Sequence, residues 1–238
     1  MRPQSVPKPK AMVSRPRAAR GNGVRPDASV GARLREKRDQ LGLSLRELAR
    51  RLEVSASLVS QIETGKIQPS VRTLYAMVNE LGLSLDEIFE LSGTSEPAKT
   101  SRGPESVRRA SEEENCDSPV SRAARVQRAH DRRALELQSG VRWERLTAWN
   151  DRDIEFLLAI YEVGGASSPD GKLVRHSGRE FGLVMSGTLG VTVGFEDHVL
   201  EAGDSISFES SIPHRLHNDG EEAVHAIWVT LGRYQETD

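Results

Sequence analysis

Apolar residues repeat with helical spacing through the stretch 44–66 and predict two short helices joined by a tight turn. In the first helix they recur at i, i+3, i+4 and i+7, as Leu45, Leu48, Ala49 and Leu52. Ser44 precedes this helix as an N-cap, and Glu47 stands three residues later, which predicts a capping box. The spacing therefore gives the first helix one apolar face and a defined start.

The second helix of this pair follows Ser55, another N-cap residue. Its expected buried face consists of Leu58, Val59 and Ile62. Gly65 is expected to end it as the left-handed residue just beyond the C-cap.

Further helical patterns flank this pair and complete a five-helix domain. Residues 30–41 predict a first helix, whose inward residues are Val30, Leu34 and Leu41. Ser70 begins a fourth helix, which Gly82 stops and whose apolar face is Leu74, Met77, Val78 and Leu81. Ser84 and Glu87 predict a second capping box, followed by Leu85, Ile88 and Phe89 as packing residues.

From about Val126 the apolar period changes from helical to two. Leu135, Leu137, Val141, Trp143 and Leu146 alternate with polar residues, and the run 154–163 suits a buried strand. Shorter strands are expected at 172–176, 180–186, 188–195, 197–201, 205–209, 213–217 and 223–231. Many short strands at close spacing predict a sandwich or a small barrel. The fold class is thus multidomain, with an all-α domain over 30–92 and an all-β domain over 126–238.

Composition adds a tail and a linker to these two domains. Residues 1–29 combine Pro, Gly and basic residues with almost no large apolar residue, which predicts a disordered basic tail. It is either an arm that adds DNA affinity or a solubilising extension. Residues 93–125 are rich in Ser, Glu, Pro and Gly and predict a flexible linker.

Cysteine content and the absence of targeting signals indicate the compartment. A single cysteine, Cys116, excludes an internal disulfide. Since the sequence shows no signal peptide and no membrane span, we expect a cytoplasmic protein without membrane contact.

Charge and side-chain size indicate what the helical domain binds. Seven Lys or Arg residues stand against one Asp in 1–29, and nine basic against five acidic residues in 30–72, whereas 121–238 holds thirteen basic and nineteen acidic residues. The second helix of the pair carries Ala56, Ser57, Ser60 and Gln61 on its polar face. Small hydrogen-bonding side chains suit the DNA major groove, where Gln can bond an adenine edge. A generic helical bundle is the alternative.

From Val30 to Leu91 the chain resembles the lambda-repressor/Cro-like (XRE) helix-turn-helix domain. The matching residues are Leu34-Arg35, Leu41-Gly42-Leu43-Ser44, Glu47-Leu48-Ala49, Val54-Ser55, Ser60-Gln61-Ile62-Glu63, Gly65-Lys66, Pro69-Ser70, Leu74 and Leu81-Gly82-Leu83. The resemblance implies double-stranded operator DNA as a partner. The expected base-edge residues are Ala56, Ser57, Ser60 and Gln61, and the expected phosphate contacts are Arg46, Arg51, Thr64 and Lys66.

Two motifs in the β-rich part resemble those of the cupin barrel. The first comprises His176, Glu180 and Gly187; the second comprises Gly203-Asp204, Phe208, Pro213-His214 and Asn218. The resemblance implies that His176, Glu180 and His214 point into the barrel as an effector pocket and as metal ligands. The cupin pattern has an additional histidine at position 174, where this chain has Val174.

Two interpretations of these three residues stay open. Two histidines and one carboxylate can hold zinc, iron(II) or a similar divalent ion with open positions. Alternatively, His214 and Glu180 form a buried hydrogen-bonded pair in a metal-free effector pocket or a purely structural barrel. Five aromatic residues are expected in the core or in dimer packing: Trp143, Phe156, Tyr161, Phe181 and Trp228.

These features predict a sequence-specific transcriptional regulator, expected to be a repressor, whose barrel binds a small-molecule effector and forms a homodimer. Paired recognition helices would read half-sites about 34 Å apart. The alternative is a cupin metalloenzyme, a dioxygenase or isomerase, tethered by its helical domain. Because Val174 removes one of the family's ligands, we expect no enzyme activity.

Overall fold

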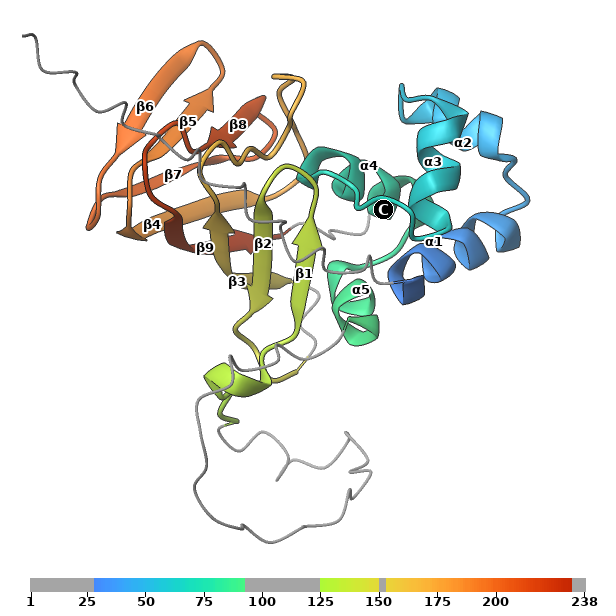
Figure 1. Ribbon diagram of the computed structural model, residues 1–238, viewed down its shortest axis with the longest axis horizontal. Helices are drawn as coiled ribbons and strands as arrows, with labels where there is room; N and C mark the ends of the chain where they lie inside the picture. The colour runs from blue at the N-terminus through green and yellow to red at the C-terminus, as the bar shows by residue number, and fades with distance from the viewer. Residues whose placement is uncertain (1–27, 93–124, 150–152, 233–238) are drawn as a thin grey trace, which may run out of the picture.

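The structure is a computed structural model that describes residues 28–92, 125–149 and 153–232 (Figure 1). A helical part precedes a β-rich part. The predicted tail, except for its last two residues, and the predicted linker, except for residue 125, lie outside the described residues. The helices are α1 (Ala28–Gln40), α2 (Leu45–Arg51), α3 (Ala56–Glu63), α4 (Val71–Leu81) and α5 (Leu85–Leu91). None of the helices in the described part is long and apolar enough to span a membrane.

Serine N-caps begin four of these helices, since Ser44, Ser55, Ser70 and Ser84 each accept a bond from the backbone N–H three residues on. The capping box at Ser84 is complete. The one predicted at Ser44 forms only in part, because the Glu47 carboxylate bonds Arg50 and Arg51 instead of the cap. Two charged guanidinium donors outcompete one backbone N–H.

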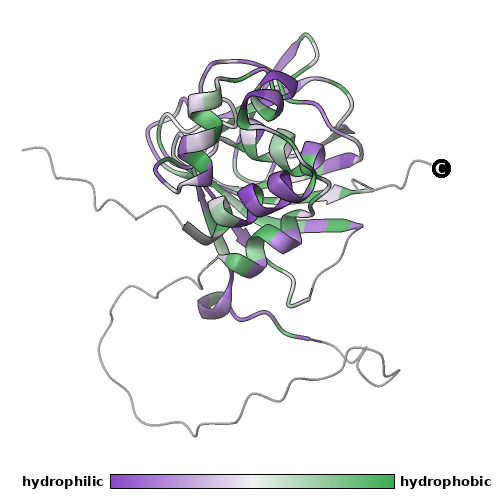
Figure 2. Ribbon diagram, turned by 90° about the vertical axis from the view of Figure 1, so that its right-hand side faces the viewer, coloured by the Kyte–Doolittle hydropathy of each residue, from purple (hydrophilic) through white to green (hydrophobic). Residues whose placement is uncertain are grey.

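The helical core is apolar and contains one buried ion pair. Figure 2 shows hydrophobic and hydrophilic residues alternating along the helices, and buried apolar residues of all five helices belong to the core. Arg38 Nε and Nη2 donate to the two carboxylate oxygens of Glu63 at 2.7 and 2.8 Å, which ties α1 to the end of α3. The prediction that Leu41 points inward is wrong. Leu41 is 49% exposed, because α1 ends at Gln40 and the chain turns away.

The β-rich part consists of two antiparallel sheets. One has the order β1-β2-β3-β9-β4-β7 and the other the order β6-β5-β8. The strands are β1 (Ala134–Leu137), β2 (Val141–Arg145), β3 (Ile154–Tyr161), β4 (Arg179–Ser186), β5 (Leu189–Val193), β6 (Glu196–Leu200), β7 (Ser205–Glu209), β8 (His214–His217) and β9 (Val224–Leu231). A short 3-10 turn, η2 (Ala129–Asp131), precedes β1.

Most predicted strands coincide with observed ones, with two corrections. The strand predicted at 172–176 is absent, because only Val174 pairs there, in an isolated bridge with His214. Leu146 does not continue the alternation of β2. Arg145 occupies the next inward position after Val141 and Trp143, and Leu146 falls out of phase and is half-buried.

Strand β3 is buried on one face only, although its sequence reads as a continuous apolar run. Phe156 on β3, Val229 on β9 and Phe181 on β4 pair side by side across the sheet. Phe156 is 37% exposed and Phe181 38% exposed. The outer face of this sheet is therefore apolar and open, while Trp143, Tyr161 and Trp228 fill the interior.

Helices α4 and α5 pack against the β-rich part next to β1 and β2 (Figure 1). Two main-chain bonds cross between the parts, from Arg72 N to Ser167 O at 3.1 Å and from Gln138 N to Pro69 O at 2.8 Å. Buried Arg145 also lies 3.2 Å from Asp86 and 3.0 Å from Glu90 on α5. The helical part is thus docked on the sheet by backbone bonds and by ion pairs.

Candidate DNA-binding face and candidate metal site

The outer face of α3 presents small polar side chains. Ser57 and Gln61 are exposed, and the Gln61 amide donates a long bond of 3.4 Å to the Ser57 hydroxyl. Ser60 and Ala56 are half-buried, and Ala56 packs partly against the core. The structure therefore leaves Gln61 and Ser57 free to reach a base edge, with Ser60 and Ala56 recessed behind them.

The residues predicted to contact phosphates differ in their surroundings. Arg46 and Lys66 are exposed and make no ion pair with any described residue. Arg51 is held between Glu47 at 2.9 Å and Glu80 at 2.7 Å, which reduces its freedom to bind a phosphate. The Thr64 hydroxyl donates to Ser60 O at 2.7 Å, at the end of α3.

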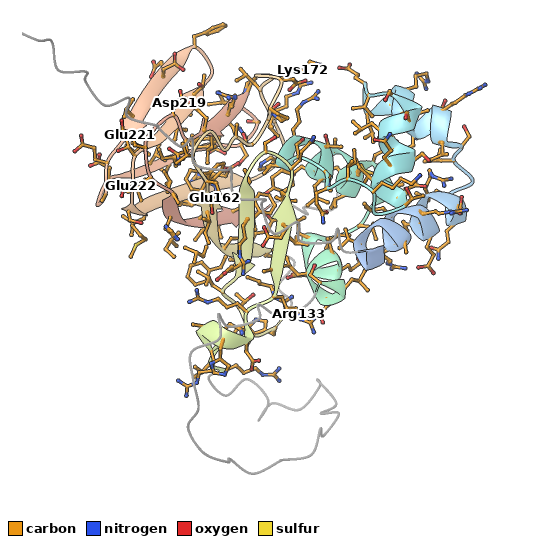
Figure 3. All side chains as sticks on the ribbon, viewed as in Figure 1. Arg133, Glu162, Lys172, Asp219, Glu221 and Glu222 are labelled. Atoms are coloured by element: carbon orange, nitrogen blue, oxygen red, sulfur yellow. The ribbon has the colours of Figure 1, made fainter. Side chains whose placement is uncertain are left out.

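Three acidic side chains of the β-rich part lie far from α3. The labelled carboxylates Asp219, Glu221 and Glu222 lie on the side of the β-rich part opposite the helices (Figure 3). A phosphate backbone meets the least repulsion when it approaches from the helical side.

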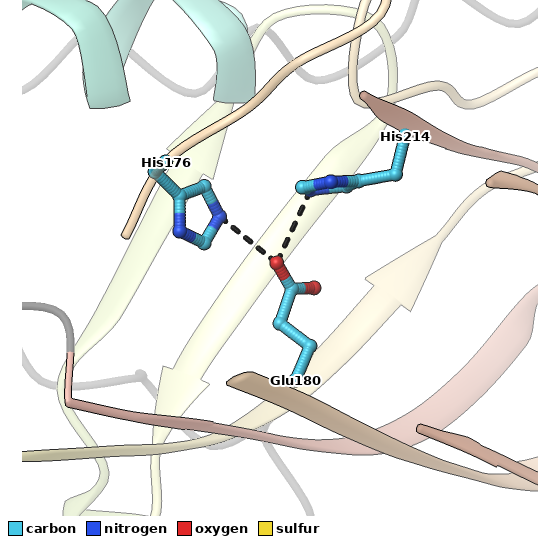
Figure 4. A group of neighbouring side chains, drawn as sticks. All are labelled: His176, Glu180 and His214. Atoms are coloured by element: carbon cyan, nitrogen blue, oxygen red, sulfur yellow. Dashed lines mark ion pairs between the residues drawn. The ribbon is translucent and has the colours of Figure 1, made fainter. Parts of the chain in front are cut away.

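Three buried side chains converge inside the barrel, as the motifs predicted (Figure 4). Glu180 comes from β4, His214 begins β8, and His176 lies on the loop that enters β4. Glu180 Oε1 lies 2.9 Å from His176 Nε2 and 3.1 Å from His214 Nε2. One carboxylate oxygen thus stands between two imidazole nitrogens.

The outward-facing atom of each of these groups already has a partner. His176 Nδ1 lies 2.9 Å from Ser177 O, and His214 Nδ1 lies 2.9 Å from Ile212 O. Because a carbonyl can only accept, each Nδ1 carries the proton and each Nε2 of a neutral ring presents a lone pair. Trp228 Nε1 donates to Glu180 Oε2 at 2.6 Å, which leaves Oε1 to face the rings.

This donor set fits a divalent metal ion. His176 Nε2 and Glu180 Oε1 are buried and lack a correctly aligned hydrogen bond, although they lie close together. In the metal-free protein, burial alone would raise the pKa of the Glu180 carboxyl, but hydrogen bonds and positive charge from His176 and His214, when these rings are protonated at Nε2, outweigh burial and lower that pKa well below its ordinary value. Two nitrogen lone pairs and a carboxylate aimed at one point match a two-His, one-carboxylate ligand set. The assignment of these residues as metal ligands stays a prediction.

Two of the three residues, Glu180 and His214, line a cavity of about 20 Å³. Val174, which replaces the additional histidine of the cupin pattern, is buried and contributes an apolar wall. Tyr161, on the same wall, is also buried, and this burial raises the pKa of its hydroxyl. A water molecule needs about 10–15 Å³ on the same measure, so the cavity accommodates one ion or one water.

Comparison with known proteins assigns both parts of the chain. A family model described as "Helix-turn-helix" matches residues 34–88, and one described as "Cupin domain" matches residues 157–230. Residues 34–88 thus form a helix-turn-helix domain and residues 157–230 a cupin domain. Both resemblances noted in the sequence are thereby confirmed.

Three known proteins align with most of this chain. The HTH-type transcriptional regulator PuuR of Escherichia coli is 28% identical over 188 residues, which cover 79% of this chain and 86% of PuuR. The crystal structure of an HTH_3 family transcriptional regulator from Vibrio cholerae aligns over 87% of this chain and 97% of its own, with a TM-score of 0.55 and 17% identity. Hydroxypropylphosphonic acid epoxidase from S. wedmorenis aligns over 87% of this chain and all of its own, with a TM-score of 0.41 and 18% identity.

Two residues next to the cupin triad escaped the sequence analysis as site residues. Trp228 was expected only as a packing residue, yet it bonds Glu180. Tyr75 lies on α4, in the helix-turn-helix domain, and its ring centroid lies 4.9 Å from that of His176. The sequence does contain a signal for Tyr75. Helix α4 carries Val71 and Tyr75 in addition to the apolar stripe that packs within its own domain, and both residues are buried.

Proposed function

We propose that this protein is a transcription regulator that binds operator DNA through α3 and senses a small-molecule effector in its cupin barrel. The observation that carries the proposal is the exposed face of α3, where Ser57 and Gln61 stand on a helix fixed from behind by the buried Arg38–Glu63 pair. The relationship to PuuR, named as a transcriptional regulator, supports this role. Repression is the proposed sign of control.

The effector site of this proposal is the barrel interior around His176, Glu180 and His214. These residues would hold a divalent ion such as zinc or iron(II), which would supply a positive charge and open coordination positions to an effector. Trp228, Ser177 O and Ile212 O would keep the three ligands oriented.

A homodimer is part of the proposal, with the outer face of β3, β9 and β4 as its interface. This face carries Phe156, Leu158, Ile160, Phe181, Leu183, Met185, Ile227 and Val229 on adjacent strands. Monomeric proteins rarely expose a contiguous apolar surface of this kind. A second copy of the same face would cover it and would pair two α3 helices about one DNA turn apart.

Selection of bound duplexes from a randomised DNA pool tests this function. Purified full-length protein at moderate salt is expected to enrich a two-fold symmetric site. Recovery of no motif would contradict the proposal. It would shift the interpretation to the alternative of a cupin metalloenzyme, a dioxygenase or isomerase, for which metal-dependent turnover is then the assay.

A further inference from the structure

The DNA-binding domain forms one wall of the barrel cavity. Val71 and Tyr75, one helical turn apart on α4, line the same cavity as Glu180 and His214. The Tyr75 ring lies 5.3 Å from that of Trp143 and 4.9 Å from that of His176, and its hydroxyl donates to buried Glu155 at 3.2 Å. A side chain of the helix-turn-helix domain is thus inserted between cupin residues.

Contacts on both sides of Tyr75 hold this helix in place. Arg72 N–H belongs to the first turn of α4, where backbone donors lack a partner within the helix, and it donates to Ser167 O of the barrel. On β2, Arg145 is buried against Asp86 and Glu90 of the neighbouring helix α5, and Arg133 lies 3.1 Å from Glu90. A buried guanidinium separated from its carboxylates costs free energy, so these pairs favour the docked arrangement.

The docked arrangement restricts what can bind at the triad. The cavity of about 20 Å³ is far smaller than the roughly 300–1,000 Å³ of pockets that enclose organic ligands. The walls from the barrel side are strands of the two sheets together with Ser167 and Val174, which backbone hydrogen bonds tie to β8, whereas Tyr75 and Val71 belong to a separate domain. The movable wall is therefore α4.

We propose that the helix-turn-helix domain is the lid of the effector pocket, with Tyr75 as the residue that closes it. An organic effector enters only when Tyr75 leaves the cavity, so effector binding and docking of α4 exclude each other. This inference rests on the proposed effector-sensing function and specifies its mechanism. Because effector and docking compete, the effector shifts the protein toward undocked DNA-binding domains and thereby changes the relative placement of the two α3 helices.

The test uses metal-free full-length protein and two variants. Arg145→Ala removes the buried guanidinium between the domains. Its matched control is Arg142→Ala on the same strand, because Arg142 pairs with Glu136 and Glu144 inside the barrel part. Tyr75→Ala removes the closing side chain itself.

Residue-level hydrogen exchange by NMR measures docking. The amides of Arg72 and Gln138 are the reporters, because each donates across the domains. We expect both to exchange at least tenfold faster in Arg145→Ala than in wild type, and at the wild-type rate in Arg142→Ala.

Carbethoxylation of histidines by diethyl pyrocarbonate, read by peptide mass spectrometry, measures entry of an organic molecule. His176 and His214 are expected to react slowly in wild type and at least tenfold faster in Arg145→Ala and Tyr75→Ala. Half-exposed His198 on β6 serves as the internal standard, and its reaction rate is expected to be the same in wild type and in both variants. Rates at His176 and His214 that stay at the wild-type level in both variants would overturn the lid.

Neither measurement needs a metal, an operator or a known effector. A failed DNA selection would therefore contradict the proposed function and leave the lid supported. If the DNA selection succeeds but the reactivity of His176 and His214 is unchanged in both variants, the lid proposal is overturned and the proposed function stands.

Discussion

Trp228 Nε1 donates a 2.6 Å hydrogen bond to Glu180 Oε2, and this bond orients the carboxylate so that Oε1 faces both imidazoles. The indole can lie there because Gly182, its partner across β4 and β9, has no side chain. A Cβ at position 182 would lie 2.1 Å from the indole ring. Glu180, Gly182 and Trp228 therefore act as one unit.

Trp228→Phe is expected to weaken divalent-metal binding about 10- to 100-fold, because the carboxylate loses the donor that orients it. Competition titration of zinc against a chromophoric chelator measures this change. Trp149→Phe is the control, since Trp149 is 45% exposed and lies outside the cavity lining. Equal zinc affinity in Trp228→Phe and wild type would contradict the orienting role.

Gln61→Ala is expected to cost about 1–3 kcal/mol at one base-pair position of the selected operator and to relax preference there. Gln61 is the longest polar side chain among the exposed predicted base-edge residues of α3. Affinities for the operator and for its single-base variants measure the effect. Gln40→Ala, at the end of α1, should bind every sequence as wild type does. A uniform loss across all sequences would show that Gln61 reads no base.

Glu63→Ala is expected to destabilise the helical domain by about 3 kcal/mol, because it leaves Nε and Nη2 of buried Arg38 without a carboxylate while only Nη1 keeps its bond to Asp39. The two side chains are only 8% and 3% exposed. Urea unfolding followed by helical circular dichroism gives the free energy. Glu36→Ala, which removes an exposed carboxylate bonded to Arg33, should change it by less than about 1 kcal/mol.

Leu183→Arg is expected to convert the proposed dimer into monomers, since it places a charge in the apolar outer face of β4. Leu183 is 39% exposed and pairs with Ile227 of β9. Light scattering coupled to size-exclusion chromatography gives the mass. Val199→Arg makes the same change at a residue that is 71% exposed on β6 in the other sheet, and should leave the dimer intact. A dimer that survives Leu183→Arg would exclude this face.

Acid should weaken α2 through Glu47. Hydrogen bonds from Arg50 and then Arg51 lower the pKa of this carboxyl from 4.5 to about 2. A carboxyl with a lowered folded-state pKa stabilises the fold above its unfolded pKa, and this contribution disappears as pH falls through the folded value. The difference in melting temperature between wild type and Glu47→Gln should thus shrink from pH 5 to 2, and also in high salt. Exposed Glu53→Gln is the control, and a constant difference would contradict the assignment.

Local sequence signals account for most of the fold. N-caps at Ser44, Ser55 and Ser84 depend on residues only three positions apart, and strand alternation depends on neighbours two apart, so both are readable without the structure. Leu41 was placed wrongly because the helical period does not reveal that α1 ends one residue earlier. At Ser44 the cap formed but the box did not, because nearby arginines compete for Glu47.

The site was predictable only where a motif carried it. His176, Glu180 and His214 follow family spacing, and the structure brings them together. Trp228 and Tyr75 reach the triad from 48 and 101 residues away in the chain, through strand register and domain docking. No local pattern places Trp228 beside Glu180. Val71 and Tyr75 add apolar positions to α4, but no local pattern shows what they pack against, because the docked position of α4 depends on contacts from Arg72, Asp86 and Arg145 together.

The inserted side chain of Tyr75 has a practical consequence for the search for the effector. When only a fraction of molecules has an open pocket, the apparent affinity falls by that fraction. If docking holds 99 of every 100 molecules closed, a true micromolar ligand would register at about 100 μM and be discarded in a screen. Ligand libraries should therefore be screened on Tyr75→Ala, and each hit should then be titrated against wild type, where the ratio of the two affinities measures how tightly the domain closes.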